Sequence, residues 1–202
     1  MKRLVLAVLM LSLAAPPAVA FDLFGFMKGD KKVSRVPQGD GKPATLDPAE
    51  AVAMISAFRR QNGLGPVTLN AQLSAIAARH AALMAKRDNL SHKLFGEPGF
   101  MQRMEAGGYD ADVAAENVGT GYHNLDQAIT GWKNSPGHRR NLLNRDVTEI
   151  GIAVAYTPKG KFHDYWALVL ARKDTRRQSG PDAGPPLTGS VTFGGAVVGG
   201  TD

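Results

Sequence analysis

The stretch "TEIGIAVAYTPKGKFHDYWALVLA", Thr148 to Ala171, decides the fold class of this chain. It contains two apolar runs rich in the β-branched and aromatic residues that strands favour, separated by Pro158-Lys159-Gly160. A Pro/Gly break between two such runs is typical of a turn. The stretch therefore predicts an antiparallel hairpin, and we expect another strand through Val113 to Val118.

Four segments upstream of this hairpin carry helical patterns. The first begins with an Asp47-Pro48 cap and stops at Gly63, and the second follows a capping Asn70. In the second segment, apolar residues recur at the three- and four-residue spacing of one buried helix face. The four expected helices cover residues 48–62, 71–87, 100–106 and 125–132. Helices that cover a sheet predict an α+β fold.

The first twenty residues resemble a secretory signal peptide. Lys2 and Arg3 precede an apolar run, Leu4 to Ala15, and Ala18-Val19-Ala20 matches the small-x-small cleavage pattern. We expect cleavage after Ala20 and export to the periplasm or the extracellular space; the alternative is an N-terminal membrane anchor. No later apolar run has the length of a transmembrane segment.

Composition divides the rest of the chain into three parts. Residues 21–45 mix charge, Gly and Pro and are expected to be a flexible linker. Residues 46–172 are expected to form the domain, since about 127 residues suffice for one core. Residues 173–202 are expected to be a low-complexity Gly/Pro-rich tail, although its "VTFGGAVVGG" stretch could form a hairpin or dock.

Charge and cysteine content exclude several classes of function. The chain has no cysteine, so it has neither disulfides nor a cysteine-based zinc site. The formal net charge is +6, without a nucleic-acid-binding motif, and we expect no nucleic-acid partner. A mildly basic exported protein is expected to be soluble and weakly attracted to anionic envelope surfaces.

Two histidines and one glutamate lie beside expected turns. His92 follows the second helix in "NLSH", and Glu116 follows an apolar run in "AENVG". His138 follows Ser135-Pro136-Gly137, which fits a type II turn with Gly137 at positive φ, so that the corner would fix the direction of His138. His80, by contrast, lies within the apolar face of the second helix and is expected to be a core residue.

These motifs occur together in an order that resembles one family. "NLSH", "AENVG", "SPGHRRNLLN", "TEIGIAVA" and "YWALVLA" follow one another across residues 50–171. The set resembles the CAP superfamily, which comprises the cysteine-rich secretory, antigen 5 and pathogenesis-related 1 proteins, and is most similar to its bacterial secreted branch.

The resemblance implies a three-layer α-β-α sandwich with a central cleft. It also implies that His92, Glu116 and His138 match three of four cleft residues, two His and two Glu, at which family members can bind divalent metal. By the family spacing the second Glu would fall at Ser135 here, so one expected acid is missing. The disulfides of eukaryotic members are missing as well.

The chemistry of this trio leaves several roles open. Two neutral imidazoles, His92 and His138, could hold a weak, exchangeable Zn²⁺ ion at about 2.0–2.1 Å. Glu116 could be a third metal ligand, could orient an imidazole, or could act as a general base on bound water. Further binding candidates are Asn117, His123, Ser135 and Arg139.

The sequence therefore supports three functions. The first is an exported CAP domain whose cleft binds an unknown small molecule, lipid or envelope component, with or without metal. The second is a metal-assisted hydrolase, protease-like or acting on envelope polymers. The third is a structural or adhesion protein of the cell envelope. The sequence does not decide whether the chain is an enzyme, because fold alone does not determine function.

Overall fold

The computed structural model describes residues 42–176, 190–193 and 196–198, with the backbone alone for the last two ranges. The chain divides into two units, Met1–Ser34 and Arg35–Asp202, and every described residue belongs to the second. The expected signal peptide at residues 1–20, most of the linker at 21–45 and part of the tail at 173–202 lie outside the described residues. None of the described helices is long and apolar enough to cross a membrane.

A mixed sheet forms the centre of the second unit. Its strand order is β1-β3-β4-β2-β5-β6. β3, β4 and β2 pair antiparallel, whereas β1 runs parallel to β3 and β5 runs parallel to β2. The strands are β1 Thr68–Leu69, β2 Ala111–Thr120, β3 Glu149–Tyr156, β4 Asp164–Lys173, β5 Ser190–Phe193 and β6 Ala196–Val198. The expected hairpin is confirmed as β3 and β4, and the strand expected through Val113 to Val118 is confirmed as β2.

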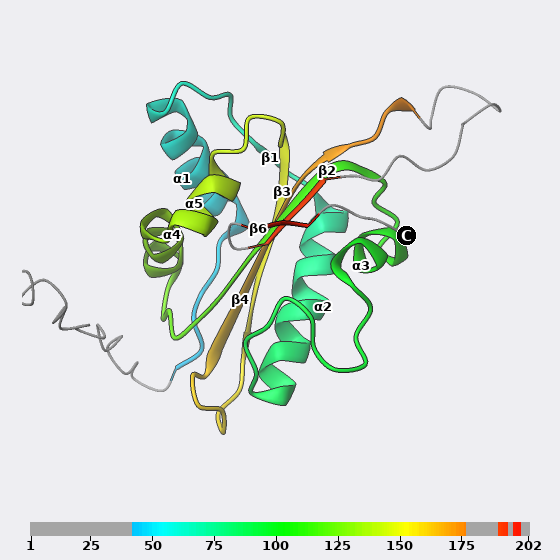
Figure 1. The fold of residues 1–202 in the computed structure, drawn as a ribbon. Coiled ribbons are helices and arrows are strands. Elements are labelled where there is room, and N and C mark those ends of the chain that lie inside the picture. Colours follow the sequence, from blue (N-terminus) through cyan, green and yellow to red (C-terminus); the bar gives the residue numbers. More distant parts are fainter. Residues whose placement is uncertain (1–41, 177–189, 194–195, 199–202) are drawn as a thin grey trace, which may run out of the picture. The chain divides into compact units, whose positions relative to one another are not determined.

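Helices cover both faces of this sheet. α2 and α3 lie on one face, and α1, α4 and α5 lie on the other (Figure 1). The helices are α1 Pro48–Gln61, α2 Ala71–Arg87, α3 Phe100–Ala106, α4 Leu125–Asn134 and α5 Pro136–Leu142. The architecture is the expected α+β fold with three layers, α-β-α.

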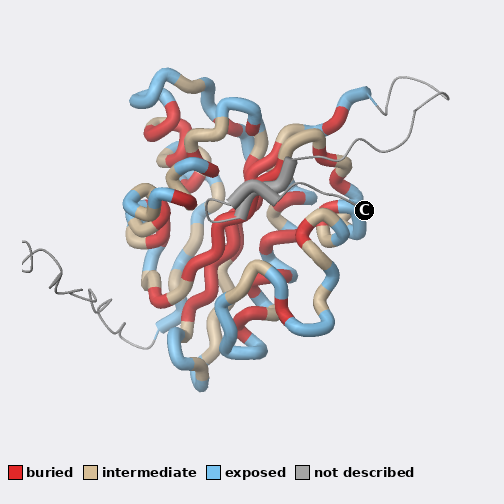
Figure 2. The backbone as a smooth tube through the Cα atoms, viewed as in Figure 1, coloured by how far each residue is buried: buried red, intermediate tan, exposed pale blue. Residues whose placement is uncertain are grey.

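Each interface between a helical layer and the sheet has its own hydrophobic core. One cluster joins Leu73, Ile76 and Met84 of α2 to side chains of β2 and β4. The other surrounds the fully buried Trp132 and Trp166. β4 contributes to both clusters, because alternate residues of a strand point to opposite faces. The central strands accordingly form the buried band of the domain (Figure 2).

A glycine sets the distance between α2 and the sheet. A Cβ atom added to Gly151 of β3 would lie 2.1 Å from the carbonyl carbon of Leu73 and from the amide nitrogen of Ser74. No side chain fits at such a separation, so this position requires glycine. The close approach fixes α2, which carries His80 near its middle.

The four expected helices are confirmed, with the fourth extending to Asn134. The expected type II turn at Ser135–His138 is wrong. Pro136 is the first residue of α5, Ser135 is its N-cap residue, and Gly137 is not among the residues with positive φ. Proline is favourable at the first helical position because its missing N–H would have no intrahelical partner there. His138 therefore lies in the first turn of a short helix and not in a loop.

Segments beyond both expected domain boundaries contact the sheet or its connections. The amide of Ala44 donates to Asp164 at 2.9 Å, and Thr45 forms an isolated bridge with Asn124. At the other end of the chain, the backbone of β5 pairs with Val113–Glu116 of β2, and β6 returns antiparallel to β5. Residues 190–193 and 196–198 thus pair antiparallel, as one of the alternatives left open by the sequence for this stretch, at an edge of the sheet where Phe193 pairs with Glu116.

Candidate functional site

Glu116 lies in the middle of β2, and its side chain is completely buried. Its Oε1 atom lies 2.9 Å from Nδ1 of His92, in the loop between α2 and α3. Arg103 of α3 donates from Nη2 to the same oxygen at 3.2 Å and to the carbonyl oxygen of His92 at 2.9 Å. Nη1 of Arg103 lies 3.0 Å from Oε2 of Glu116. A strand, a loop and a helix therefore meet at one carboxylate.

The charge of Glu116 determines the orientation of the His92 ring. Burial raises the pKa of Glu116, but the hydrogen bond from His92 and the positive charge of Arg103 outweigh it and hold that pKa below its ordinary value of 4.5. An ionised carboxylate only accepts hydrogen bonds, so Nδ1 of His92 carries the proton. In the neutral ring, Nε2 is then the nitrogen that can contact a ligand or metal.

A second buried pair, His80 and Glu97, adjoins this group. Nδ1 of His80 lies 2.7 Å from Oε1 of Glu97, and its Nε2 lies 2.9 Å from the carbonyl oxygen of Ser91. The Glu97 side chain is 5% exposed, and its Oε1 lies 3.6 Å from Nε of Arg103. The guanidinium of Arg103 thus lies between two buried carboxylates, Glu97 and Glu116.

Sequence reasoning placed His80 correctly in the core but missed its partner Glu97 as part of the site. Glu97 lies in the same loop as His92, five residues later, where acids are common on protein surfaces. Its pairing with a histidine of α2 depends on how the loop folds back over that helix. A buried histidine on an apolar helix face is the one local indication, because such a ring needs polar partners.

His138 is positioned by two asparagines that attach α5 to β2. Nδ2 of Asn117 donates to the carbonyl oxygen of His138 at 3.1 Å. Nδ2 of Asn141, one turn further along α5, donates to Oδ1 of Asn117 at 2.8 Å and to the carbonyl oxygen of Glu116 at 3.3 Å. Both amide side chains are buried. The side chain of Asn117, an expected binding residue, is therefore hydrogen-bonded to two residues of α5.

His92 and His138 lie near enough to interact electrostatically. Burial lowers the pKa of His138, and the charge that His92 can carry lowers it further. The pKa of His138 therefore lies below its ordinary value of 6.5, which favours the neutral ring. The structure thus places His92 against Glu116, and His138 within electrostatic range of His92.

The model of the cysteine-rich secretory protein family, CAP, matches residues 52–170, more than half of the chain. The chain belongs to the CAP family. The match begins inside α1 and ends inside β4, so it spans every element that carries the residues of the site.

Relatives of this CAP domain are bacterial proteins of other lengths. An uncharacterized membrane protein of Bacillus subtilis is 30% identical over 115 residues, which are 56% of this chain and 33% of the relative. An extracellular protein of Bacillus anthracis with an SCP domain has a similar structure, at 23% identity and a TM-score of 0.55, covering 64% of this chain and 45% of that chain. An outer surface protein of Borrelia burgdorferi has 22% identity and a TM-score of 0.55, covering 66% of this chain and all of that one.

The likeness to these two solved structures supports the fold alone, because identity is below a quarter. The CAP domain described here spans a third of the length of the first relative. Activities and partners of the relatives are therefore not transferred with the fold.

The other expected binding residues of the CAP domain make contacts of their own. Nδ1 of His123, in the loop after β2, lies 3.4 Å from Oδ2 of Asp164. Arg139 lies over the ring of Phe58 on α1, with its guanidinium carbon 4.8 Å from the ring centroid. Ser135 caps α5 without a side-chain hydrogen bond to the helix. His123 and Arg139 thus contact other parts of the domain, and their role in binding stays a prediction.

The site does not fit a closed metal centre. Both oxygens of Glu116 lie against Arg103 or His92, inside the protein. Within the part of the chain that the structure describes, no group of three or more His, Asp or Glu side chains is arranged to hold a metal ion. The geometry favours the role in which Glu116 orients His92, and it leaves the two imidazoles as the groups that could contact a metal.

Proposed function

We propose that this protein is an exported CAP-domain binding protein, whose ligand is held at the His92–His138 pair. The observation that carries the proposal is the 2.9 Å contact between His92 and the buried, ionised Glu116. A buried carboxylate is costly unless it is paired and hydrogen-bonded. Here the paired carboxylate of Glu116 also fixes the tautomer of the His92 ring, and the His92 side chain is 29% exposed. A fixed tautomer matters for function when Nε2 of His92 contacts a ligand.

Export is supported by the N-terminal sequence and by the relatives. The charged start, apolar run and Ala18-Val19-Ala20 pattern are those of a signal peptide. Two similar structures come from an extracellular and an outer surface protein. We infer that the mature chain works outside the cytoplasm, in the periplasm or beyond the cell.

Metal binding at this site is proposed as weak and exchangeable. Two imidazole nitrogens provide fewer ligands than the three or four of ordinary zinc sites. Zn²⁺ would use Nε2 of His92 and a nitrogen of His138, and it would stabilise the pair without being required for the fold. Because a protonated ring cannot ligate, binding would fail at acidic pH.

Calorimetric titration with Zn²⁺ tests this site. We expect weak binding to the wild type and loss of binding in His92→Ala and in His138→Ala. Glu116→Gln should weaken binding by about 10- to 100-fold if the carboxylate orients the ring. His163→Ala is the matched control, since His163 lies in the turn between β3 and β4 and contacts Thr157. Unchanged affinity in both site variants would show that the two rings do not share a ligand.

The second candidate function is a hydrolase, in which His92 acts as a general base oriented by Glu116. The pairing of the His92 imidazole with a buried carboxylate favours it, because the carboxylate accepts from Nδ1 and so makes Nε2 the nitrogen that can take up a proton. Assays against casein and against cell-wall polymer, with and without Zn²⁺, separate the two functions. Hydrolysis that is lost in His92→Ala would establish the enzyme, and its absence from the wild type would leave ligand binding.

A further inference from the structure

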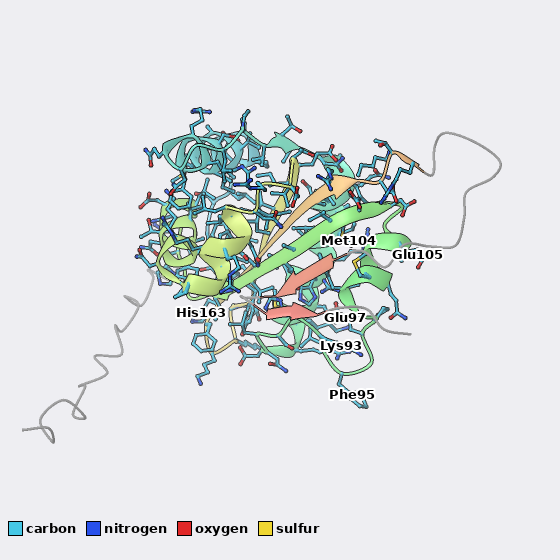
Figure 3. The ribbon with its side chains drawn as sticks, turned by 45° about the horizontal axis from the view of Figure 1, so that its top comes forward. Lys93, Phe95, Glu97, Met104, Glu105 and His163 are labelled. Carbon is cyan, nitrogen blue, oxygen red and sulfur yellow. The ribbon has the colours of Figure 1, made fainter. Side chains whose placement is uncertain are left out.

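Exposed apolar side chains gather at one end of the domain. Among the described residues, four large hydrophobic side chains are exposed, and three of them, Leu90, Phe95 and Phe162, belong to two neighbouring segments. Phe95 is 96% exposed, which is nearly complete for an aromatic ring. Figure 3 shows Phe95 at the outer part of its loop, with its side chain directed away from the helices and strands. The fourth, Leu69, lies in β1, just before the opposite end of α2.

Hydrogen bonds hold the two segments together. Nη1 of Arg87, the last residue of α2, donates to the carbonyl oxygen of Phe95. The next residue, Asp88, accepts from the amide of Lys161 at 2.7 Å and from the hydroxyl of Tyr165. The loop after α2 and the turn between β3 and β4 therefore share an anchor, and they lie side by side at the lower edge of the domain in Figure 1.

Positive charge surrounds these apolar side chains. Residues 86–95 and 159–162, which we call the basic aromatic end, contain five Lys and Arg residues and one acid, Asp88. All five cationic residues are exposed. The ammonium of Lys161 lies 5.1 Å from the centroid of the Phe162 ring. Cations beside an exposed aromatic ring match the interface of an anionic bilayer, where phosphate groups lie next to acyl chains.

We propose that the basic aromatic end docks the protein on an anionic lipid surface, with Phe95 inserted between the headgroups. The cations provide long-range attraction, and the apolar side chains provide the part of the binding that salt does not screen. A soluble polyanion would use the same cations but would gain nothing from Phe95. Because His92 lies in the same loop, docking would place the His92–Glu116 site next to the lipid.

Tryptophan fluorescence tests the insertion at the position proposed. The two native tryptophans, Trp132 and Trp166, are fully buried, so Phe95→Trp adds a reporter that is otherwise in water. We expect its emission to shift to shorter wavelength with vesicles of phosphatidylcholine and phosphatidylglycerol, and to be quenched by brominated lipid. Leu69→Trp, at the exposed position near the other end of α2, is the matched control and should not respond. An unshifted emission of Phe95→Trp in bound protein would overturn the proposal.

Sedimentation with the same vesicles measures affinity. All variants are made in the full chain, so any lipid affinity of the apolar stretch at residues 4–15 is common to them. Phe95→Ala should weaken binding by about 5- to 10-fold, and the double change Lys93→Glu and Lys161→Glu by at least about 10-fold. Arg145→Glu, an exposed charge in the connection from α5 to β3, should have little effect. Equal binding of the wild type and Phe95→Ala, together with equal competition by dextran sulfate, would show a polyanion site instead of a membrane site.

This proposal is independent of the ligand site. Zn²⁺ titration of Phe95→Ala should match that of the wild type, because the Phe95 ring is 96% exposed and Arg87 contacts the backbone carbonyl of Phe95, which the substitution keeps. Conversely, His138→Ala should bind vesicles normally. Failure of one proposal thus leaves the other intact.

Discussion

Nδ1 of His92 lies 2.9 Å from Oε1 of Glu116, and that carboxylate is completely buried against Arg103. The buried carboxylate of Glu116 therefore anchors the loop that carries His92 to strand β2. The arrangement links the orientation of His92 to the ionisation of a group that solvent does not reach. Both the site and the stability of the domain should respond when Glu116 is changed or protonated.

Glu116→Gln should destabilise the fold by about 3–5 kcal/mol at neutral pH, because Arg103 would lose its fully buried partner. The folded-state pKa of Glu116 lies below 4.5, so its contribution is present above about pH 4.5 and is lost as pH falls through the folded-state pKa. The variant should therefore lose less stability than the wild type on acidification. Urea unfolding at several pH values measures this, with the exposed Glu105→Gln as control. Parallel acid profiles of wild type and Glu116→Gln would contradict it.

The ring of His138 should titrate below pH 6.5, since burial first and His92 second lower its pKa. In His92→Ala the pKa of His138 should rise but remain below 6.5, because only the contribution of His92 is removed. Proton NMR of the imidazole signals measures both values. His123→Ala serves as the control, because His123 interacts with Asp164. An unchanged His138 titration in His92→Ala would mean that the two rings are not neighbours.

The same shift makes stability depend on pH. An unfolded chain takes up a proton at position 138 near pH 6.5, before the folded chain does, so the free energy of unfolding should decrease as pH falls below about 6.5. His138→Gln should remove this part of the pH dependence. Thermal unfolding of both proteins between neutral and mildly acidic pH gives the comparison. A decrease of the same size in the variant would assign the effect to other groups.

Arg59 should be a determinant of the position of α5. It is buried in α1 and donates to the carbonyl oxygens of Gly65, Leu142, Asn144 and Val147 at 2.8–3.1 Å. Arg59→Met would leave these acceptors without their donor and should cost about 4 kcal/mol. The exposed neighbour Arg60→Met should be nearly neutral. Urea unfolding tests the stability, and an altered NMR titration of His138 would show that α5 has moved.

Truncation after Arg176 tests the role of β5 and β6. We expect one cooperative unfolding transition, because the truncated chain keeps all of the described residues that form the two hydrophobic clusters, most of them on α1–α5 and β2–β4. Amides of Val113–Glu116 should exchange faster, since β5 would no longer cover that edge of β2. Hydrogen exchange and calorimetry measure these effects. Loss of cooperativity would show that the domain requires β5 and β6 for its stability and would refute the expected domain boundary at residue 172.

Local pattern determined much of the fold. The caps at Asp47 and Asn70, the helical spacing of residues 71–87 and the Pro/Gly break before β4 gave the correct elements, because these signals act within a few residues. The prediction of a turn at Ser135 was wrong because the local sequence there is ambiguous. Ser-Pro-Gly suits a type II turn and a helix start almost equally, and the bonds from Asn117 and Asn141 that favour the helix come from distant contacts.

The site depended more on tertiary structure. Sequence motifs selected His92, Glu116 and His138, and the fold places His92 against Glu116, and His138 within electrostatic range of His92. Only the folded chain showed that Glu97 lies in the same buried network as Glu116, that Arg139 faces Phe58, and that residues 190–193 pair with β2. Charge pairing in an interior and pairing at a strand edge join residues far apart in the chain. The free energy of these pairings depends on burial in the folded chain, and a sequence pattern does not show which distant residues are buried together.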